Sequence, residues 1–141
     1  MASGIHEIAR RPKLLVVDDD ADIRASLRDI LEEEGFSVVD MPDGECALLH
    51  LWHDEPPAVM LLDLMMPKCS GWEVLAACRK SERLRDLPII VMSAMDPRAS
   101  QLRVSIAAHI TKPISMTSLV ERVKELVAAS STSKGNTYRV M

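Results

Sequence analysis

Four groups of reactive or charged residues in this sequence each follow a short, strand-like apolar run. In chain order they are the acidic triplet Asp18-Asp19-Asp20, the carboxylate Asp63, the hydroxyl Ser93 and the amine Lys112. An open α/β sheet places its chemistry just past the carboxyl ends of its strands, so all four groups are expected at one edge of one sheet. A carboxylate nucleophile, metal-binding carboxylates, a hydroxyl and a lysine together predict a site for phosphoryl transfer.

The elements that must position these groups alternate between strand and helix patterns, which predicts an α/β fold with a doubly wound parallel sheet. Strands are expected at 14–17, 36–39, 58–62, 88–92 and 106–110. Helices are expected at 21–34, 43–53, 71–83, 96–104 and 115–129. Five-stranded sheets of this kind take the order 2-1-3-4-5 and have right-handed crossovers. That order brings Asp18 and Asp19 beside Asp63.

Three neighbouring carboxylates repel one another, and a single divalent cation relieves the repulsion. The ligands are hard oxygens and few, which favours Mg²⁺, with Mn²⁺ as a substitute. A simpler interpretation is that the acidic triplet only caps the following helix, but this explains neither Asp63 nor Lys112. Asp20 is the better candidate for that cap, while a metal site that uses Asp20 in place of Asp19 stays open.

Three stretches of this chain resemble the receiver domain of two-component response regulators of the chemotaxis-regulator type. They are Leu15-Val16-Val17-Asp18-Asp19-Asp20, Leu62-Asp63-Leu64-Met65-Met66-Pro67 with Gly71, and Thr111-Lys112-Pro113. The resemblance implies a flavodoxin-like receiver fold. It divides the chain into an N-terminal extension at 1–12, a receiver domain at 13–129 and a disordered tail at 130–141.

The resemblance also implies a role for each matching residue. Asp63 would accept a phosphoryl group from a phosphohistidine, Ser93 would donate its hydroxyl to a phosphoryl oxygen, and Lys112 would bridge carboxylate and phosphoryl oxygens. The implied metal ligands are Asp18, Asp19, Asp63 and the backbone carbonyl of Met65. Receivers usually point the lysine into the site through a cis Lys-Pro bond, which predicts a cis peptide between Lys112 and Pro113.

The sequence departs from the family's pattern after Ser93. Ser93 and Lys112 are 19 positions apart, which is shorter than receivers usually have and predicts a shortened fourth helix region. His109 holds the position, three before the lysine, where receivers commonly place a Tyr or Phe that turns inward on activation. Two interpretations of His109 stay open: a titratable form of that switch residue, or a surface histidine with no switching role.

Composition limits the remaining possibilities. With 141 residues, of which 48% are apolar and 27% charged, the chain suits one soluble domain. A net charge of −4 gives no electrostatic reason to expect nucleic-acid binding. No apolar run approaches the ~20 residues that a membrane span needs, and no secretory signal is present, so a cytoplasmic location is expected. Cys46, Cys69 and Cys78 contain no C-x-x-C pair and predict neither a disulfide framework nor a zinc site.

The expected function is that of a stand-alone, monomeric response regulator receiver. Its phosphoryl donor would be a sensor histidine kinase or a histidine phosphotransfer protein, and its output would be contact with a downstream protein effector, without membrane or nucleic-acid binding of its own. On this interpretation the chain is not an enzyme, because it catalyses only its own phosphorylation and dephosphorylation.

Three alternatives remain. In the first, the chain is a receiver fragment of a longer transcription regulator or hybrid histidine kinase, which full gene length decides. A haloacid-dehalogenase-type phosphatase also uses an aspartyl nucleophile and Mg²⁺, but it needs a second Asp where this chain has Met65. A degenerate receiver that is never phosphorylated is disfavoured because every chemical residue is present.

Overall fold

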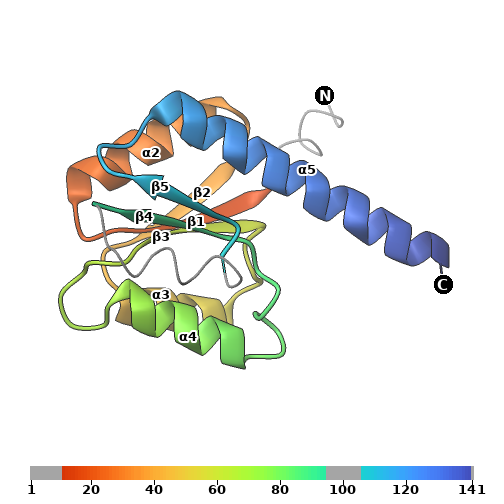
Figure 1. The fold of residues 1–141 in the computed structure, drawn as a ribbon, viewed down its shortest axis with the longest axis horizontal. Helices are drawn as coiled ribbons and strands as arrows, with labels where there is room; N and C mark the ends of the chain where they lie inside the picture. The colour runs from red at the N-terminus through yellow and green to blue at the C-terminus, as the bar shows by residue number, and fades with distance from the viewer. Residues whose placement is uncertain (1–10, 95–105, 141) are drawn as a thin grey trace.

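The computed structural model of the chain describes residues 11–94 and 106–140. Five parallel strands form one sheet in the order β2-β1-β3-β4-β5, as predicted. They are β1 (Lys13–Val17), β2 (Ser37–Met41), β3 (Val59–Asp63), β4 (Ile89–Ser93) and β5 (Ala108–Thr111). The described helices are α2 (Ala21–Glu33), α3 (Gly44–His53), α4 (Gly71–Lys80) and α5 (Met116–Val140). In Figure 1, α2 and α5 cover one face of the sheet, while α3 and α4 cover the other.

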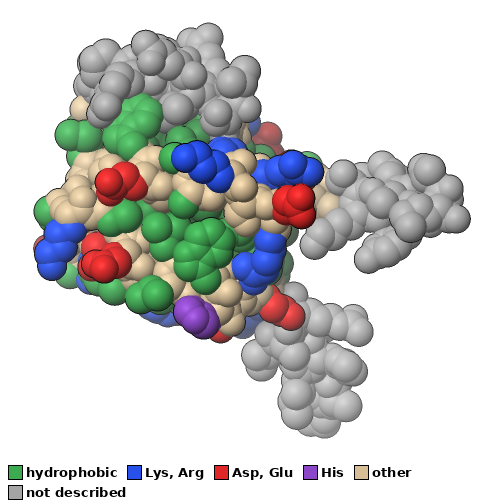
Figure 2. Space-filling view, turned by 90° about the horizontal axis from the view of Figure 1, so that it is seen from below, with side chains coloured by type: hydrophobic (Ala, Val, Ile, Leu, Met, Phe, Trp, Pro, Cys, Tyr) green, Lys and Arg blue, Asp and Glu red, His purple; other side chains and the backbone are tan. Residues whose placement is uncertain are grey.

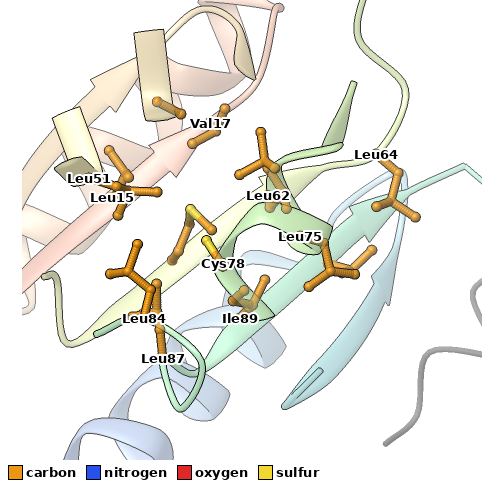
Figure 3. Close-up of a cluster of buried hydrophobic side chains, with 14 of the residues drawn as sticks. Leu15, Val17, Leu51, Leu62, Leu64, Leu75, Cys78, Leu84, Leu87 and Ile89 are labelled. Carbon is orange, nitrogen blue, oxygen red and sulfur yellow. The ribbon is translucent and has the colours of Figure 1, made fainter. Parts of the chain in front are cut away.

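Two hydrophobic clusters hold these three layers together. Strands β3 and β4 are buried along their whole length, which explains why their sequences are apolar throughout. Successive side chains of a strand point to opposite faces, so Leu14 packs in the α2/α5 cluster and Leu15 in the α3/α4 cluster. Figure 3 shows the second cluster, where side chains of the sheet meet those of α3, α4 and the segment after α4. Each fully buried aliphatic side chain contributes about 1.5–3 kcal/mol.

Helix α2 has a defined start and end. The side chain of Asp20 accepts hydrogen bonds from the backbone N–H groups of Asp22 (2.9 Å) and Ile23 (3.2 Å), which confirms the prediction that Asp20 is the helix cap. Gly35 follows the helix with φ = 99°, a backbone conformation that favours glycine, and this ends α2.

Apart from the end of α5, three predicted boundaries differ from the described structure by two or three residues, and several others differ by one. β2 runs on to Met41, because Asp40 and Met41 pair with the end of β1. β5 begins at Ala108 rather than at residue 106, and its first bridge joins Ala108 to Ile90. Helix α4 ends at Lys80 instead of residue 83, since Ser81 takes an extended conformation.

The end of the chain differs more. Residues 130–141 are predicted to be a disordered tail, but α5 continues to Val140 and extends past the sheet in Figure 1. The polar composition of this segment disfavours a packed core, but adding turns to an existing helix is far less costly than nucleating one, and the segment has no proline. The predicted helix at 96–104 lies outside the described residues.

The α3/α4 side of the molecule presents a mixed surface. Leu49 and Trp52 on α3 are 57% and 48% exposed, and Figure 2 shows hydrophobic side chains on this side interspersed with charges of both signs. The three cysteines are free thiols, of which only Cys78 is fully buried.

Within the described residues, none of the helices combines the length and the apolar character that crossing a membrane requires.

Candidate functional site

The carboxyl ends of four neighbouring strands bring the candidate residues together. β1 leads directly into Asp18, β3 ends at Asp63, β4 ends at Ser93 and β5 leads into Lys112. Because the strands are parallel, these ends lie at one edge of the sheet. The predicted convergence of these residues is therefore confirmed, whereas their chemical roles stay predictions.

Asp18 is fully buried and firmly held. One carboxylate oxygen accepts a hydrogen bond from the backbone N–H of Asp20 at 2.9 Å, and the other accepts one from Lys112 Nζ at 2.9 Å. Its backbone carbonyl accepts Nη1 of Arg24 at 2.7 Å, and its backbone N–H donates to the carbonyl of Met41 at 3.2 Å. Contacts within the fold therefore hold the Asp18 side chain in place without the help of a ligand.

Asp63 is 3% exposed. Its Oδ1 accepts the backbone N–H of Met65 at 3.1 Å, and its Oδ2 lies 3.5 Å from Lys112 Nζ. Burial raises the pKa of Asp63 to about 6; the Met65 N–H and the charge of Lys112 oppose this rise, and the charges of Asp18 and Asp19 add to it. The carboxylate is thus largely ionised, and so nucleophilic, above neutral pH.

Asp19 completes an acidic cluster with the two buried carboxylates. Oxygen atoms of Asp18, Asp19 and Asp63 all lie within 4.8 Å of one another, and Asp19 itself is exposed. Three carboxylates at this separation carry more negative charge than the adjacent Lys112 neutralises, and a hard divalent cation would neutralise the excess. The cluster therefore fits the predicted Mg²⁺ site, and Asp20, already occupied as a helix cap, does not belong to it.

Lys112 links the two buried carboxylates. Burial alone would lower the pKa of its amine, but the hydrogen bond and charge of Asp18, with the contribution of Asp63, outweigh that effect and leave the pKa above its ordinary value. Lys112 therefore stays a cation throughout the physiological range. The Lys112-Pro113 peptide is cis, as predicted.

The segment after Asp63 returns to the site through Gly71. A Cβ atom at this position would collide with the carbonyl oxygen of Asp63 and lie 2.6 Å from Cα of Leu64, so the approach of α4 to the strand end requires glycine. Ser70 caps α4 through a reciprocal capping box with Glu73, in which Ser70 N–H donates to Glu73 Oε2 at 2.9 Å. The S-x-x-E pattern from Ser70 to Glu73 is the signal in the sequence that indicates this cap.

Ser93 is fully buried at the end of β4 and has a partner that the sequence did not reveal. Its Oγ lies 2.7 Å from Nε2 of His109, which is on the neighbouring strand β5. The structure thus connects the predicted phosphoryl-binding hydroxyl directly to the predicted switch residue. Neither interpretation of His109 included this contact.

A second network that sequence reasoning missed lies beneath Asp18. The guanidinium of Arg24 donates to the Asp18 carbonyl and, through Nε, to Asp40 Oδ2 at 2.9 Å. Arg28 also pairs with Asp40, and these hydrogen bonds hold the pKa of Asp40 below its ordinary value despite partial burial. Because Arg24 and Asp40 belong to different elements, no local sequence pattern indicates their contact.

Comparisons with known proteins agree with this geometry. The chain is 40% identical over 117 residues to "Response regulator RR06" of Streptococcus pneumoniae, a match that covers 81% of this chain and 52% of that protein. It is 36% identical over 135 residues to "Transcriptional regulatory protein PrrA" of Mycobacterium tuberculosis, covering 92% of this chain and 57% of that protein. The chain therefore spans about half the length of the curated relatives it matches.

Solved structures have the same architecture. The receiver domain of the Francisella response regulator 1452 aligns with a TM-score of 0.77 and 31% identity, covering 85% of this chain and 99% of that one. Chemotaxis response regulator CheY4 of Vibrio cholerae aligns with a TM-score of 0.75 and 25% identity, covering 82% and 98%. The family model described as "Response regulator receiver domain" matches residues 14–124, which include every candidate site residue. From the sheet order, the clustered site and this match, the chain belongs to the response regulator receiver domain family.

Proposed function

We propose that this receiver accepts a phosphoryl group on the carboxylate of Asp63 from a phosphohistidine of a sensor histidine kinase or a histidine phosphotransfer protein. The observation that carries this proposal is the buried Asp63 carboxylate, which lies beside the acidic pair Asp18 and Asp19 and beside the amine of Lys112. A buried carboxylate with an adjacent cation is a nucleophile whose surroundings neutralise incoming negative charge.

In the proposed transfer, an oxygen of Asp63 forms a bond to phosphorus while the phosphorus–nitrogen bond to the donor histidine breaks. The released imidazole keeps the bonding electron pair and takes up a proton. Lys112, already 3.5 Å from Asp63 Oδ2, contributes a positive charge to the phosphoryl oxygens. Ser93 supplies a hydroxyl hydrogen to one of them.

Mg²⁺, or Mn²⁺ in its place, would be held by Asp18, Asp19, Asp63 and the backbone carbonyl of Met65. When bound, the cation supplies positive charge that stabilises both the clustered carboxylates and the transferring group. The oxygen-only donor set of the three aspartates matches what these cations prefer.

We further propose that phosphorylation is read out by contact with a protein effector, in the cytoplasm, and that the chain modifies no substrate other than itself. A second arrangement has a specific observation in its favour: PrrA of Mycobacterium tuberculosis is called a transcriptional regulatory protein, and both it and RR06 are about twice as long as the matched region. In that arrangement the receiver would act on an attached output domain. An antibody against this receiver, used on extracts of the native cell, distinguishes a 15.6 kDa product from one of about twice that mass.

The phosphorylation itself is tested by incubation with acetyl phosphate and Mg²⁺. We expect the intact mass of the wild type to rise by one phosphate, and that of Asp63→Asn to stay constant. The matched control is Asp29→Asn, which changes an exposed aspartate on α2 and should be labelled like the wild type. Labelling that persists in Asp63→Asn, or that is undiminished by EDTA, would contradict the proposal.

A further inference from the structure

The hydrogen bond between Ser93 and His109 joins the inside of the site to the molecular surface. Ser93 is fully buried, whereas His109 is exposed on β5, and the bond between Oγ and Nε2 is short at 2.7 Å. The register of the two strands pairs His109 with Val91 and Ser93 with Thr111, so the bond runs diagonally between adjacent strands. Among the described residues, His109 is the partner that the structure gives to the Ser93 hydroxyl.

The direction of this bond decides what Ser93 can do. A serine hydroxyl has one hydrogen to donate and two lone pairs that accept. If Nε2 of His109 lacks a hydrogen, the Ser93 hydroxyl donates to it and has no hydrogen left for a phosphoryl oxygen. If Nε2 carries the hydrogen, it donates to Oγ, and the Ser93 hydrogen is available for the phosphoryl group.

We propose that His109 is a positioning residue for the phosphoryl-binding hydroxyl of Ser93, and that the phosphorylated receiver requires the Nε2–H form of its imidazole. Nε2–H then donates to Ser93 Oγ, whose own hydrogen bonds a phosphoryl oxygen on Asp63. This inference rests on the proposed function and assigns a regulatory contact to the same site. His109 is not a catalytic residue, because it acts through Ser93.

The surroundings of His109 allow its imidazole to change between the two neutral forms. His109 is exposed, and its side chain projects from the face of β5 opposite to that of Ala108 and Ile110, which pack on the α2/α5 side. Water that reaches the exposed ring can give a proton to one ring nitrogen and take a proton from the other. Loading of the buried site is thereby linked to the hydrogen-bond arrangement of a group on the outer surface of β5.

The kinetic test compares two substitutions that differ in the donor they keep. His109→Gln retains an N–H donor near the position of Nε2, whereas His109→Phe keeps a ring without any donor. With acetyl phosphate and Mg²⁺, we expect His109→Phe to be labelled about five- to ten-fold more slowly than the wild type, as for the loss of one hydrogen bond, and His109→Gln to stay within about two-fold. The control His53→Phe, an exposed histidine on α3, should leave the rate unchanged.

The same substitutions in a Ser93→Ala background show whether His109 acts through the hydroxyl. We expect the effect of His109→Phe to fall below about two-fold there, because the group that it positions is gone. An equal effect in both backgrounds, or a wild-type rate in His109→Phe, would overturn the role of His109 while leaving phosphorylation of Asp63 intact. No labelling of the wild type on Asp63 would overturn both proposals.

A spectroscopic measurement tests the inference without relying on rates. The ¹⁵N shifts of histidine rings distinguish Nε2–H from Nδ1–H forms, and the His109 signals are identified by their loss in His109→Gln. At pH 8.5 we expect beryllofluoride, a mimic of the phosphoryl group, to shift His109 to the Nε2–H form in the wild type and not in Asp63→Asn. An Nε2 without hydrogen in the beryllofluoride-bound wild type would overturn the proposal.

Discussion

The two sides of the site are held in different ways. On the β1/β3 side, Asp18 is fixed by four hydrogen bonds, which involve its carboxylate, its carbonyl and its N–H group. On the β4/β5 side, the Ser93 hydroxyl has one described bond, to the exposed His109. The strands differ accordingly, since β3 is buried throughout and β5 alternates between half-buried and exposed residues.

This difference shows which part of the site is prepared before a ligand arrives. Carboxylates are costly to bury without partners, so the side that carries them must be satisfied within the fold itself. A neutral hydroxyl costs less to rearrange and can exchange one partner for another. We therefore expect changes to the buried carboxylates, or to Lys112 that pairs with them, to affect stability, and changes to Ser93 or His109 to affect phosphorylation more than stability.

Removal of the lysine that joins the two buried carboxylates should have the largest effect. Lys112→Met leaves Asp18 and Asp63 buried without their cation, and we expect the free energy of unfolding to fall by about 3–5 kcal/mol at pH 8 without divalent cations. Urea unfolding measures it. The control Lys124→Met removes an exposed pair with Glu34 and should cost less than about 1 kcal/mol. Equal losses in the two variants would contradict the comparison.

Asp63→Asn should have the next largest effect. Unlike most substitutions of buried residues, it should raise the free energy of unfolding. Because burial raises its pKa to about 6, the folded state binds the Asp63 proton more tightly than the unfolded state, whose pKa is near 3.8. The contribution of Asp63 to stability therefore falls as the pH rises from about 4 through 6. Asp63→Asn cannot ionise, so we expect it to be more stable than the wild type by about 3 kcal/mol at pH 8, with the difference vanishing near pH 4.

Urea unfolding across this pH range, without divalent cations, measures the difference between Asp63→Asn and the wild type. Addition of Mg²⁺ at pH 8 should stabilise the wild type more than the variant, which has lost a charged ligand. A difference that is constant from pH 4 to 8 would show that ionisation of the buried Asp63 carboxylate does not destabilise the folded state.

A smaller effect is expected from the network beneath Asp18. Arg24→Met removes the donor to the Asp18 carbonyl, and we expect a loss of about 1–2 kcal/mol in the free energy of unfolding. Mg²⁺ should also bind about ten-fold more weakly, because the turn that carries two acidic ligands is less well held. Calorimetric titration with Mg²⁺ measures this change.

Arg28→Met is the matched control for Arg24→Met. Arg28 also pairs with the side chain of Asp40, but it donates its backbone-directed hydrogen bond to the carbonyl of Val38 (2.8 Å) and not to that of Asp18. We expect a comparable loss of stability with Mg²⁺ affinity within about two-fold of the wild type. Equal Mg²⁺ affinities in the two variants would remove the positioning role of Arg24.

The smallest effect on stability is expected on the β4/β5 side. Ser93→Ala removes one hydrogen bond whose other partner, His109, is exposed and can bond water instead, so the cost should be below about 1 kcal/mol. Urea unfolding under the conditions used for Lys112→Met gives the direct comparison. A loss as large as that of Lys112→Met would show that both sides of the site are equally fixed.

Local sequence patterns predicted most of the fold and the composition of the site. Apolar runs predicted the five strands, and the polar residues after them predicted which groups share one edge, because parallel strands end on the same side. Boundaries were less well predicted, since Met41 joins β2 only through pairing with β1 and α5 continues beyond the last periodic residues. The cap at Asp20 was predicted correctly because a helix cap depends on residues close by in the sequence.

The sequence by itself thus determined which residues gather, and the tertiary structure decided which of them touch. The bond between Ser93 and His109 depends on the register of β4 against β5, and the contact of Arg24 with Asp40 depends on how α2 lies over β2. Similarly, Gly71 is required because the backbone of α4 approaches that of β3. These contacts arise from the relative placement of separate elements, which the packing of the core sets and which no pattern within one segment contains.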